Sequence, residues 1–512
     1  MAIRHEVIPR EYRDSVALMQ LSAALAKLPG IQQASAVMGT ENNLGLLRQV
    51  GMEIGKTTAG PNDLLIVVQG EEAALQPAVD EAKARLAAKG AQPDGGGVQK
   101  LAPRSIAMAQ AEDAGANLAM ISTPGEYATA EALKALNLGL NVMLFSNNVP
   151  VADEAMLKRV ARDKDLIVMG PDCGTAIING IPLAFANVVR RGPIGVVGAS
   201  GTGLQEVTVL VDRLGSGISQ AIGTGGHDLS NEVGGISMLT GLKYLAGDPD
   251  TKVIVLISKP PSKGIADEIL GKARAAGKPV VVIFMGAEAK ALSGGNLHGA
   301  RTLEDAARAA IALAQGRKPE PPGDAVQLPP GIPRLAAGQK FIRGLFSGGT
   351  FGFQATMLLQ ETVEVHSNTK VGKSLLLKDM WKSEGHTVVD LGDDVFTRGR
   401  PHPMIDYRLR TERIVQEAGD PQMAVLLLDV VLGYGSHADP AAELAPALRA
   451  GREVAQKSGR AFLCLGHICG TEGDPQGLAS QVQVLQAAGM VLADSNAQAV
   501  RLARAIVAQA KG

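Results

Sequence analysis

Cysteine is scarce in this chain of 512 residues, in which only Cys173, Cys464 and Cys469 carry thiols. Three thiols cannot build a disulfide framework, so the class of small, disulfide-stapled proteins is excluded and a reducing compartment is expected. Aromatic residues make up only 3% of the chain. That is too few for a surface on which nucleic-acid bases stack, and the abundance of alanine, glycine and valine is typical of layered α/β proteins.

The chain also has no excess of positive or negative charge, because its 50 Lys and Arg residues balance its 51 Asp and Glu residues, for a formal net charge of −1. No run of like charge predicts nucleic acid or an anionic membrane as a partner. No apolar run reaches the roughly 18 residues that a membrane-spanning helix needs, and the first residues do not resemble a targeting segment. We therefore expect a soluble, cytoplasmic protein.

The length predicts several domains, and strands that alternate with helices predict parallel, doubly wound sheets of the α/β class. A glycine-rich segment at 92–99 and a proline-rich one are linkers by composition. The predicted organisation is a small ferredoxin-like or ACT-like module at 1–92, a Rossmann-like domain at 100–190, a flavodoxin-like domain at 191–316, the Pro-rich linker at 317–338 and a second flavodoxin-like domain at 339–512.

A glycine-rich corner in GVVGASGTGLQEV, residues 195–207, predicts a strand, a tight turn and a helix. Ser200, Gly201, Thr202 and Gly203 stand where the first free N–H groups of that helix would lie. These amides and the helix dipole favour an anion, most naturally phosphate. The alternative is a corner that needs glycine for its geometry alone. The later corner Gly348-Gly349-Thr350 repeats the pattern and indicates a duplicated architecture.

Polar loops follow three predicted strands before this corner. Because ligands of parallel sheets bind at the carboxyl ends of strands, these loops are candidates for a substrate or CoA edge, although each loop could be a simple turn. Cys173 has no recognisable base beside it and is interpreted first as a packing residue. The residues of this candidate edge are Ser122, Pro124, Asn147, Asn148, Pro171, Asp172 and Cys173.

The densest polar cluster of the chain lies at 393–406, in a stretch without helical or strand periodicity. Arg398 and Arg400 could pair with a carboxylate, and Asp393 or Asp394 could hold an amide. The alternative is a loop whose ion pairs satisfy one another. Elsewhere, the spacing of Cys464, His467 and Cys469 matches no usual zinc pattern, so no metal site is predicted.

Several long motifs carry a resemblance to known enzymes. GPIGVVGASGTGLQEV, with DPDTKVIVLISKPP downstream, resembles the second domain of the succinyl-CoA synthetase α subunit, and DLIVMGPDCGT resembles the end of that subunit's CoA-binding domain. DPQMAVLLLDVVLGYGSHADP is similar to the carboxyl-terminal domain of the β subunit. The whole combination, especially PDCGTAIINGIPLAFANVV and LGDDVFTRGRPHPMIDYRLR, resembles the FdrA proteins, which are described as predicted acyl-CoA synthetases.

The resemblance implies a phosphate site between two helix starts, as in the synthetases. The first would be the Ser200 corner, and the second the segment of Gly433, Gly435, Ser436 and His437. His437 would then orient phosphate or act as an acid, with a structural, hydrogen-bonded histidine as the alternative. Together with His437, we name Arg398, Arg400 and Asp393 as catalytic candidates.

Three departures from the synthetases matter for the reaction. The loop that carries their phosphohistidine has no matching register here, since His298 falls several residues late. The glycine loop that holds the phosphates of CoA has no clear counterpart, and no ATP-grasp domain is recognised. The resemblance to FdrA proteins therefore implies transfer of an acyl or carbamoyl group to inorganic phosphate, of the oxamate carbamoyltransferase type, in purine and allantoin catabolism.

Two other functions stay open. The chain could be the CoA-binding half of an acyl-CoA ligase that borrows its nucleotide domain from a partner chain, or a non-catalytic scaffold that binds a small molecule. The expected partners are a small acyl or carbamoyl substrate and, in the assembly, other subunits of a hetero-oligomer or a second copy in a homodimer. Inorganic phosphate is the expected co-substrate, and the sequence does not decide whether CoA binds.

Overall fold

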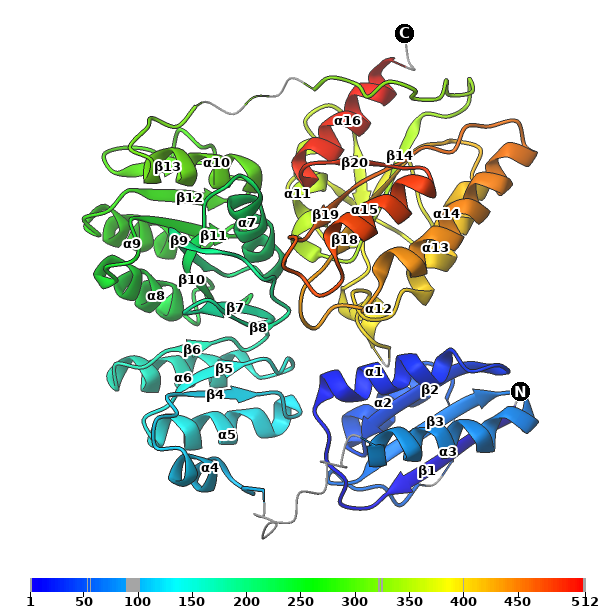
Figure 1. The fold of residues 1–512 in the computed structure, drawn as a ribbon, viewed down its shortest axis with the longest axis horizontal. Helices are drawn as coiled ribbons and strands as arrows, with labels where there is room; N and C mark the ends of the chain where they lie inside the picture. Colours follow the sequence, from blue (N-terminus) through cyan, green and yellow to red (C-terminus); the bar gives the residue numbers. More distant parts are fainter. Residues whose placement is uncertain are drawn as a thin grey trace. The chain divides into compact units, whose positions relative to one another are not determined.

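The computed structural model describes residues 2–52, 54–55, 57–88, 102–320, 323, 326–398 and 400–509. The chain forms two compact parts (Figure 1). The first comprises Met1–Ala114 with Gly392–Asp406, and the second Gly115–Leu391 with Tyr407–Gly512. The predicted linker at 92–99 lies outside the described residues.

The first part contains the predicted small α/β module. Its three strands form an antiparallel sheet in the order β1-β3-β2, and the residues from Leu64 to Val68 on the central strand are fully buried. Helix α1 begins after Asp14, whose carboxylate accepts a hydrogen bond from Ala17 N and so caps the helix. The elements are β1 (Ala2–Ile8), α1 (Ser15–Ala26), β2 (Ile31–Met38), α2 (Glu41–Gln49), β3 (Leu64–Gly70), α3 (Glu72–Ala88), α4 (Ile106–Glu112) and the short α12 (Asp394–Thr397).

The second part begins with a small parallel sheet in the order β4-β5-β6. Its helices are amphipathic, and their alanine-rich faces pack on the strands, as Ala128, Ala132 and Ala135 of α5 show by their complete burial. The elements are β4 (Leu118–Ile121), α5 (Gly125–Asn137), β5 (Asn141–Leu144), α6 (Val151–Asp163) and β6 (Val168–Met169).

A seven-stranded sheet in the order β13-β12-β11-β9-β10-β7-β8 follows. Its central strands are fully buried and rich in valine and isoleucine, as expected for parallel strands with helices on both faces. The elements are β7 (Thr175–Ile178), β8 (Ile181–Ala184), β9 (Arg191–Gly198), α7 (Gly201–Arg213), β10 (Ile218–Gly223), α8 (Ile236–Gly247), β11 (Val253–Ser258), α9 (Lys263–Arg274), β12 (Val280–Phe284), β13 (Leu297–Gly299) and α10 (Leu303–Ala314).

A second seven-stranded sheet has the order β16-β15-β17-β14-β18-β19-β20, and all neighbouring strands in it are parallel. The described residues between α10 and β14 contain neither helix nor strand, as expected for the Pro-rich linker. The elements are β14 (Phe341–Phe346), α11 (Gly349–Leu359), β15 (Val365–Ser367), β16 (Leu375–Leu376), β17 (His386–Asp390), α13 (Arg408–Gly419), β18 (Met423–Val431), α14 (Pro440–Lys457), β19 (Cys464–Cys469), α15 (Leu478–Ala487), β20 (Met490–Ala493) and α16 (Asn496–Gln509).

These sheets confirm the predicted α/β class with two large flavodoxin-like domains. One detail differs from the expectation. The hairpin of β7 and β8 pairs with β10, so it lies in the first seven-stranded sheet and not with the Rossmann-like strands of 100–190. None of the helices within the described ranges has the length and hydropathy needed to cross a membrane.

Both large sheets have a point at which the strand order turns. In the first sheet, β10 lies on one side of β9 and β11, which comes later in the chain, lies on the other side. In the second sheet, β15 and β17 lie on one side of β14 and the later strand β18 lies on the other side. Loops that follow the strands on either side of such a point diverge and leave a crevice, which is where α/β proteins bind ligands. The two corners singled out in the sequence follow β9 and β14, at these two points.

Candidate functional site

The start of α7 presents unused backbone donors. Ser200 is the N-cap residue, and its hydroxyl accepts a hydrogen bond from Gly203 N at 3.1 Å. Within the part of the chain that the structure describes, the amides of Ser200, Gly201 and Thr202 have no acceptor. Ser200 and Thr202 are buried and Gly201 is half-buried, so these amides lie in a sheltered, electropositive position that favours an anion.

The start of α11 is built differently. The carboxylate of Asp429 accepts hydrogen bonds from Ser347 N, Ser347 Oγ and Gly348 N, each at 2.8 Å. Those donors are therefore already used by the protein's own anion. The amides of Gly349 and Thr350 have no acceptor among the described residues.

The two helix starts meet. Ser200 Oγ and Thr350 Oγ1 are 2.6 Å apart and share a hydrogen bond. A Cβ on Gly348 would lie 3.0 Å from Thr202 Cγ2, so glycine allows this close approach. Figure 1 shows α7 and α11 side by side where the two large sheets face each other. The positive ends of two helix dipoles therefore point at one region, which we call the phosphate corner, made of Ser200–Gly203 and Gly348–Thr350.

The segment 433–437 is not a helix start, contrary to the expectation. Helix α14 begins at Pro440, and the Asp439 carboxylate caps it by accepting a hydrogen bond from Ala442 N. The signal was in the sequence, since an Asp followed by Pro is the typical start of a helix. The segment is a loop after β18, in which Gly433 and Gly435 have φ values of 100° and 79°.

This loop nevertheless lies close to the phosphate corner. Tyr434 N donates a hydrogen bond to Ala186 O at 2.9 Å, and Asn187 Nδ2 donates to Leu432 O at 3.0 Å. The Asn187 side-chain oxygen Oδ1 in turn accepts from Gln205 Nε2 of α7 at 3.1 Å. Asn187, which the sequence did not single out, thus connects α7 with the loop after β18.

His437 has defined partners in this loop. Its Nδ1 accepts a hydrogen bond from Asp439 N at 3.0 Å, and its Nε2 lies 3.6 Å from Glu443 Oε1. The ring packs edge-on against Tyr407, with centroids 5.8 Å apart. An imidazole held through Nδ1 carries its proton on Nε2 when neutral, so the arrangement is compatible both with a proton donor and with a structural histidine.

The residues of the candidate substrate edge come together at the carboxyl end of the small sheet. Asp172 N donates to Ser146 O at 3.0 Å, and Ser146 Oγ donates to Thr123 O at 2.5 Å. A Cβ on Gly125 would lie 2.3 Å from Asn147 O, so the loops after β4 and β5 are in contact. The structure therefore unites the three loops that contain Ser122, Pro124, Asn147, Asn148, Pro171, Asp172 and Cys173.

This edge continues into the phosphate corner. Cys173 Sγ lies beside Thr175, whose hydroxyl donates to Phe185 O at 2.7 Å and would be 3.4 Å from a Cβ on Gly201. The loop after β10 contacts the Pro171 loop of this edge, since a Cβ on Gly225 would lie 2.3 Å from Pro171 O. A ligand bound at this edge would therefore lie near the amides of α7.

A buried cluster of charged side chains anchors the loop after β10. Lys158 Nζ donates to Glu154 Oε1 at 2.6 Å, to Asp228 Oδ1 at 2.9 Å and to Thr224 O at 2.8 Å. All three charged side chains are at most 1% exposed. Burial raises the pKa of Glu154, and the neighbouring Lys158 charge opposes this shift.

The three cysteine thiols are buried, and we expect them to be unreactive. Burial raises the pKa of the Cys173 and Cys464 thiols to about 12 and that of Cys469 well above its ordinary value. At about pH 8, a thiol of pKa 12 is ionised in about one molecule in ten thousand. We therefore expect no thiol to react with Ellman's reagent within minutes in the native protein and all three to react in denaturant. Stoichiometric labelling of the native protein would contradict this account of Cys173.

The remaining candidates lie in the other compact part. Asp393 caps the short helix α12 through a hydrogen bond from Val395 N at 3.0 Å, and Arg398 and Arg400 are exposed. The phosphate corner belongs to the second part, so the catalytic role expected for these three residues stays a prediction. Cys464 and His467 lie on the buried strand β19, and no group of metal-ligating side chains is found in the described ranges.

The matches to known protein families identify an α/β protein of the acyl-CoA-ligase type. A family of CoA-ligase domains matches residues 345–506, a family of CoA-binding domains matches residues 189–286, and a family described as the heavy metal-associated domain of AllF matches residues 1–103. The last range contains no cysteine, so thiolate binding of soft metals is excluded there.

The YahF protein of Escherichia coli (strain K12) is 42% identical over 513 residues, with 99% of each chain covered. The chain belongs to this family, the FdrA-type acyl-CoA synthetase-like proteins. A mitochondrial succinate–CoA ligase subunit alpha-2 of Trichomonas vaginalis is 30% identical over 35% of this chain and 58% of its own length. A dinucleotide-forming acetyl-coenzyme A synthetase 1 of Ca. Korarchaeum cryptofilum covers 82% of this chain and 88% of its own, with 15% identity and a TM-score of 0.34.

Proposed function

We propose that the chain is an enzyme subunit that transfers a carbamoyl or related acyl group to inorganic phosphate. For oxalurate, a phosphate oxygen attacks the carbamoyl carbon, the C–N bond breaks, and the leaving nitrogen takes the proton of hydrogen phosphate. The products are carbamoyl phosphate and oxamate. The reaction needs a bound phosphate held in line with a carbonyl, and donors for the charge that develops on the carbonyl oxygen.

One observation carries this proposal: the starts of α7 and α11 face each other with unused amides and joined hydroxyls. Phosphate is the anion that such a pair of helix starts favours. The adjoining substrate edge supports the proposal, because it lies beside Thr175, whose hydroxyl would be 3.4 Å from a Cβ on Gly201. Thr202 N and Gly201 N would serve as donors toward phosphate oxygens.

A phosphorylated histidine is not part of the proposal. His298 lies on β13, an edge strand that β12 and β11 separate from β9 and its corner. His437 is the remaining histidine candidate near the corner, and we assign it the relay of the proton from hydrogen phosphate to the leaving nitrogen. Phosphate itself is the attacking group, so no covalent enzyme intermediate is needed.

The test is the formation of carbamoyl phosphate. The full chain, alone and with its partner subunits, is incubated with oxalurate and ³²P-labelled inorganic phosphate without ATP or CoA. We expect labelled carbamoyl phosphate and oxamate in equal amounts, with no label retained on the protein. If the complete assembly forms no carbamoyl phosphate, the proposal is wrong.

A second function, acyl-CoA ligation with a partner that supplies the nucleotide site, is favoured by the match of residues 189–286 to CoA-binding domains. Similar proteins are themselves subunits, such as the sulfoacetate–CoA ligase subunit SauD of Bilophila wadsworthia, which is 28% identical over 34% of this chain. Under this function, the protein retains label from γ-³²P-ATP on a histidine when the partner is present, and CoA is consumed.

A further inference from the structure

Three side chains near the carboxyl ends of β14 and β18 carry polar atoms that have no partner among the described residues. Arg410 reaches from α13 to the carboxyl ends of both strands, where its guanidinium donates to Leu345 O at 2.9 Å and to Asp429 Oδ1 at 2.6 Å. Its Nη1 has no partner among the described residues, although the side chain is completely buried. An arginine N–H that is left unpaired in this way is costly, so a ligand atom is expected beside it.

Two hydroxyl groups also lack a hydrogen-bond partner. Tyr407 is 1% exposed, and neither its Oη nor Ser436 Oγ has a hydrogen-bond partner in the described part of the chain. Tyr407 links the group, since its ring centroid lies 5.9 Å from Arg410 Cζ and 5.8 Å from the ring of His437, the neighbour of Ser436. Burial raises the pKa of Tyr407, so its hydroxyl remains a donor.

We propose that Arg410, Tyr407 and Ser436 form a subsite for the terminal carboxylate of the acyl substrate. An arginine N–H and two hydroxyls donate to oxygen, and a carboxylate is the acceptor that such a set prefers. Asp429 cannot be that acceptor for all of them, because its oxygens are held by Ser347, Gly348 and Arg410.

The position of this subsite fits the proposed reaction, on which the inference rests. Asp429 lies between Arg410 and the amides of the phosphate corner, so the subsite and the corner are adjacent. A substrate with a carboxylate at one end and the reacting carbonyl at the other spans the two. The charged groups that face Tyr407 are Arg410, Asp429 and Glu443, with His437 next to Glu443.

The test measures binding without turnover. Oxamate and succinate are titrated calorimetrically into the full chain and into Tyr407→Phe and Ser436→Ala, which remove one hydroxyl each. We expect a carboxylate to bind the wild type and each variant to bind it about tenfold to a hundredfold more weakly, as for a lost hydrogen bond to a charged group. Oxamide, which has no carboxylate, is expected to bind more weakly than oxamate.

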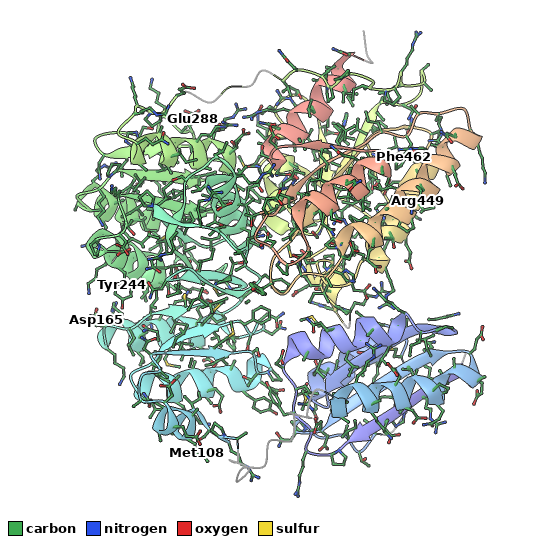
Figure 2. The ribbon with its side chains drawn as sticks, in the orientation of Figure 1. Met108, Asp165, Tyr244, Glu288, Arg449 and Phe462 are labelled. Carbon is green, nitrogen blue, oxygen red and sulfur yellow. The ribbon has the colours of Figure 1, made fainter. Side chains whose placement is uncertain are left out.

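Tyr244→Phe is the matched control, because the Tyr244 hydroxyl already donates to Asp165 O at 2.9 Å and the two residues lie together at an outer edge of the second part (Figure 2). It should bind like the wild type. If neither carboxylate binds the wild type, or if Tyr407→Phe and Ser436→Ala bind as well as the control with unchanged thermal unfolding, the subsite is wrong. A chain that binds oxamate as expected but forms no carbamoyl phosphate would contradict the proposed function alone.

Discussion

Replacement of Gly201 by aspartate is expected to abolish phosphate binding without unfolding the protein. A Cβ at this position would have Thr175 Oγ1 as its nearest neighbour, at 3.4 Å, so a Cβ atom is accommodated in ordinary van der Waals contact. The new carboxylate would lie at the first turn of α7, where the helix dipole stabilises it. There it repels bound phosphate by about 4 kcal/mol at a separation of 4 Å and an effective dielectric constant of 20, which corresponds to nearly a thousandfold in affinity.

The control is Gly201→Asn, which has the same shape without the charge. We expect phosphate affinity, measured by isothermal titration calorimetry, to fall far less in Gly201→Asn than in Gly201→Asp. Both variants should have the thermal unfolding temperature of the wild type within a few degrees. Equal phosphate affinity in Gly201→Asp and the wild type would mean that the amides of α7 do not hold the anion.

Replacement of Lys158 by methionine is expected to destabilise the second part strongly. The change leaves the carboxylates of Glu154 and Asp228 buried without their cation, which costs about 3–5 kcal/mol and lowers the unfolding temperature by about 10 °C. Lys134→Met is the matched control. Its partner Glu131 is at the surface, and such a pair contributes about 0–1 kcal/mol.

The loss in Lys158→Met should depend on pH. Burial raises the pKa of Glu154 in the folded chain, and removal of the Lys158 charge raises it further. Between its unfolded and its folded pKa, such a carboxyl is protonated in the folded state but ionised in the unfolded state. The free energy of unfolding therefore falls as the pH rises from the unfolded pKa through the folded pKa. Calorimetric scans at about pH 5 and pH 8 should therefore show the larger deficit at pH 8. A deficit that is equal at both values would contradict this role for Glu154.

Local signals predicted the first half of the candidate site. Glycines at 201 and 203 and a serine at 200 indicate a capped helix start after a strand, and α7 begins at Gly201 with Ser200 as its cap. The repeat at Gly348–Thr350 was visible for the same reason. Which helix start faces α7 was not visible, because Ser200 and Thr350 are 150 residues apart and their contact depends on how the two sheets pack.

Other residues of the site carry no sequence pattern. Asn187 and Lys158 act through partners that are far away in the chain, and only the assembled fold shows that they are buried and bonded. The polar density around Arg398 and Arg400 indicated a functional loop, yet the loop belongs to the other compact part and its function stays a prediction. Clustered charge in a sequence shows that a segment is solvated, which does not say what it contacts.

Free phosphate is expected to bind between the starts of α7 and α11. The decisive experiment is a crystal structure of the full chain soaked in arsenate, which is shaped like phosphate and gives an anomalous signal. We expect an arsenate within hydrogen-bonding distance of the amides of Gly201, Thr202 and Thr350. Arsenate bound at another place, with these amides left facing water, would contradict this expectation.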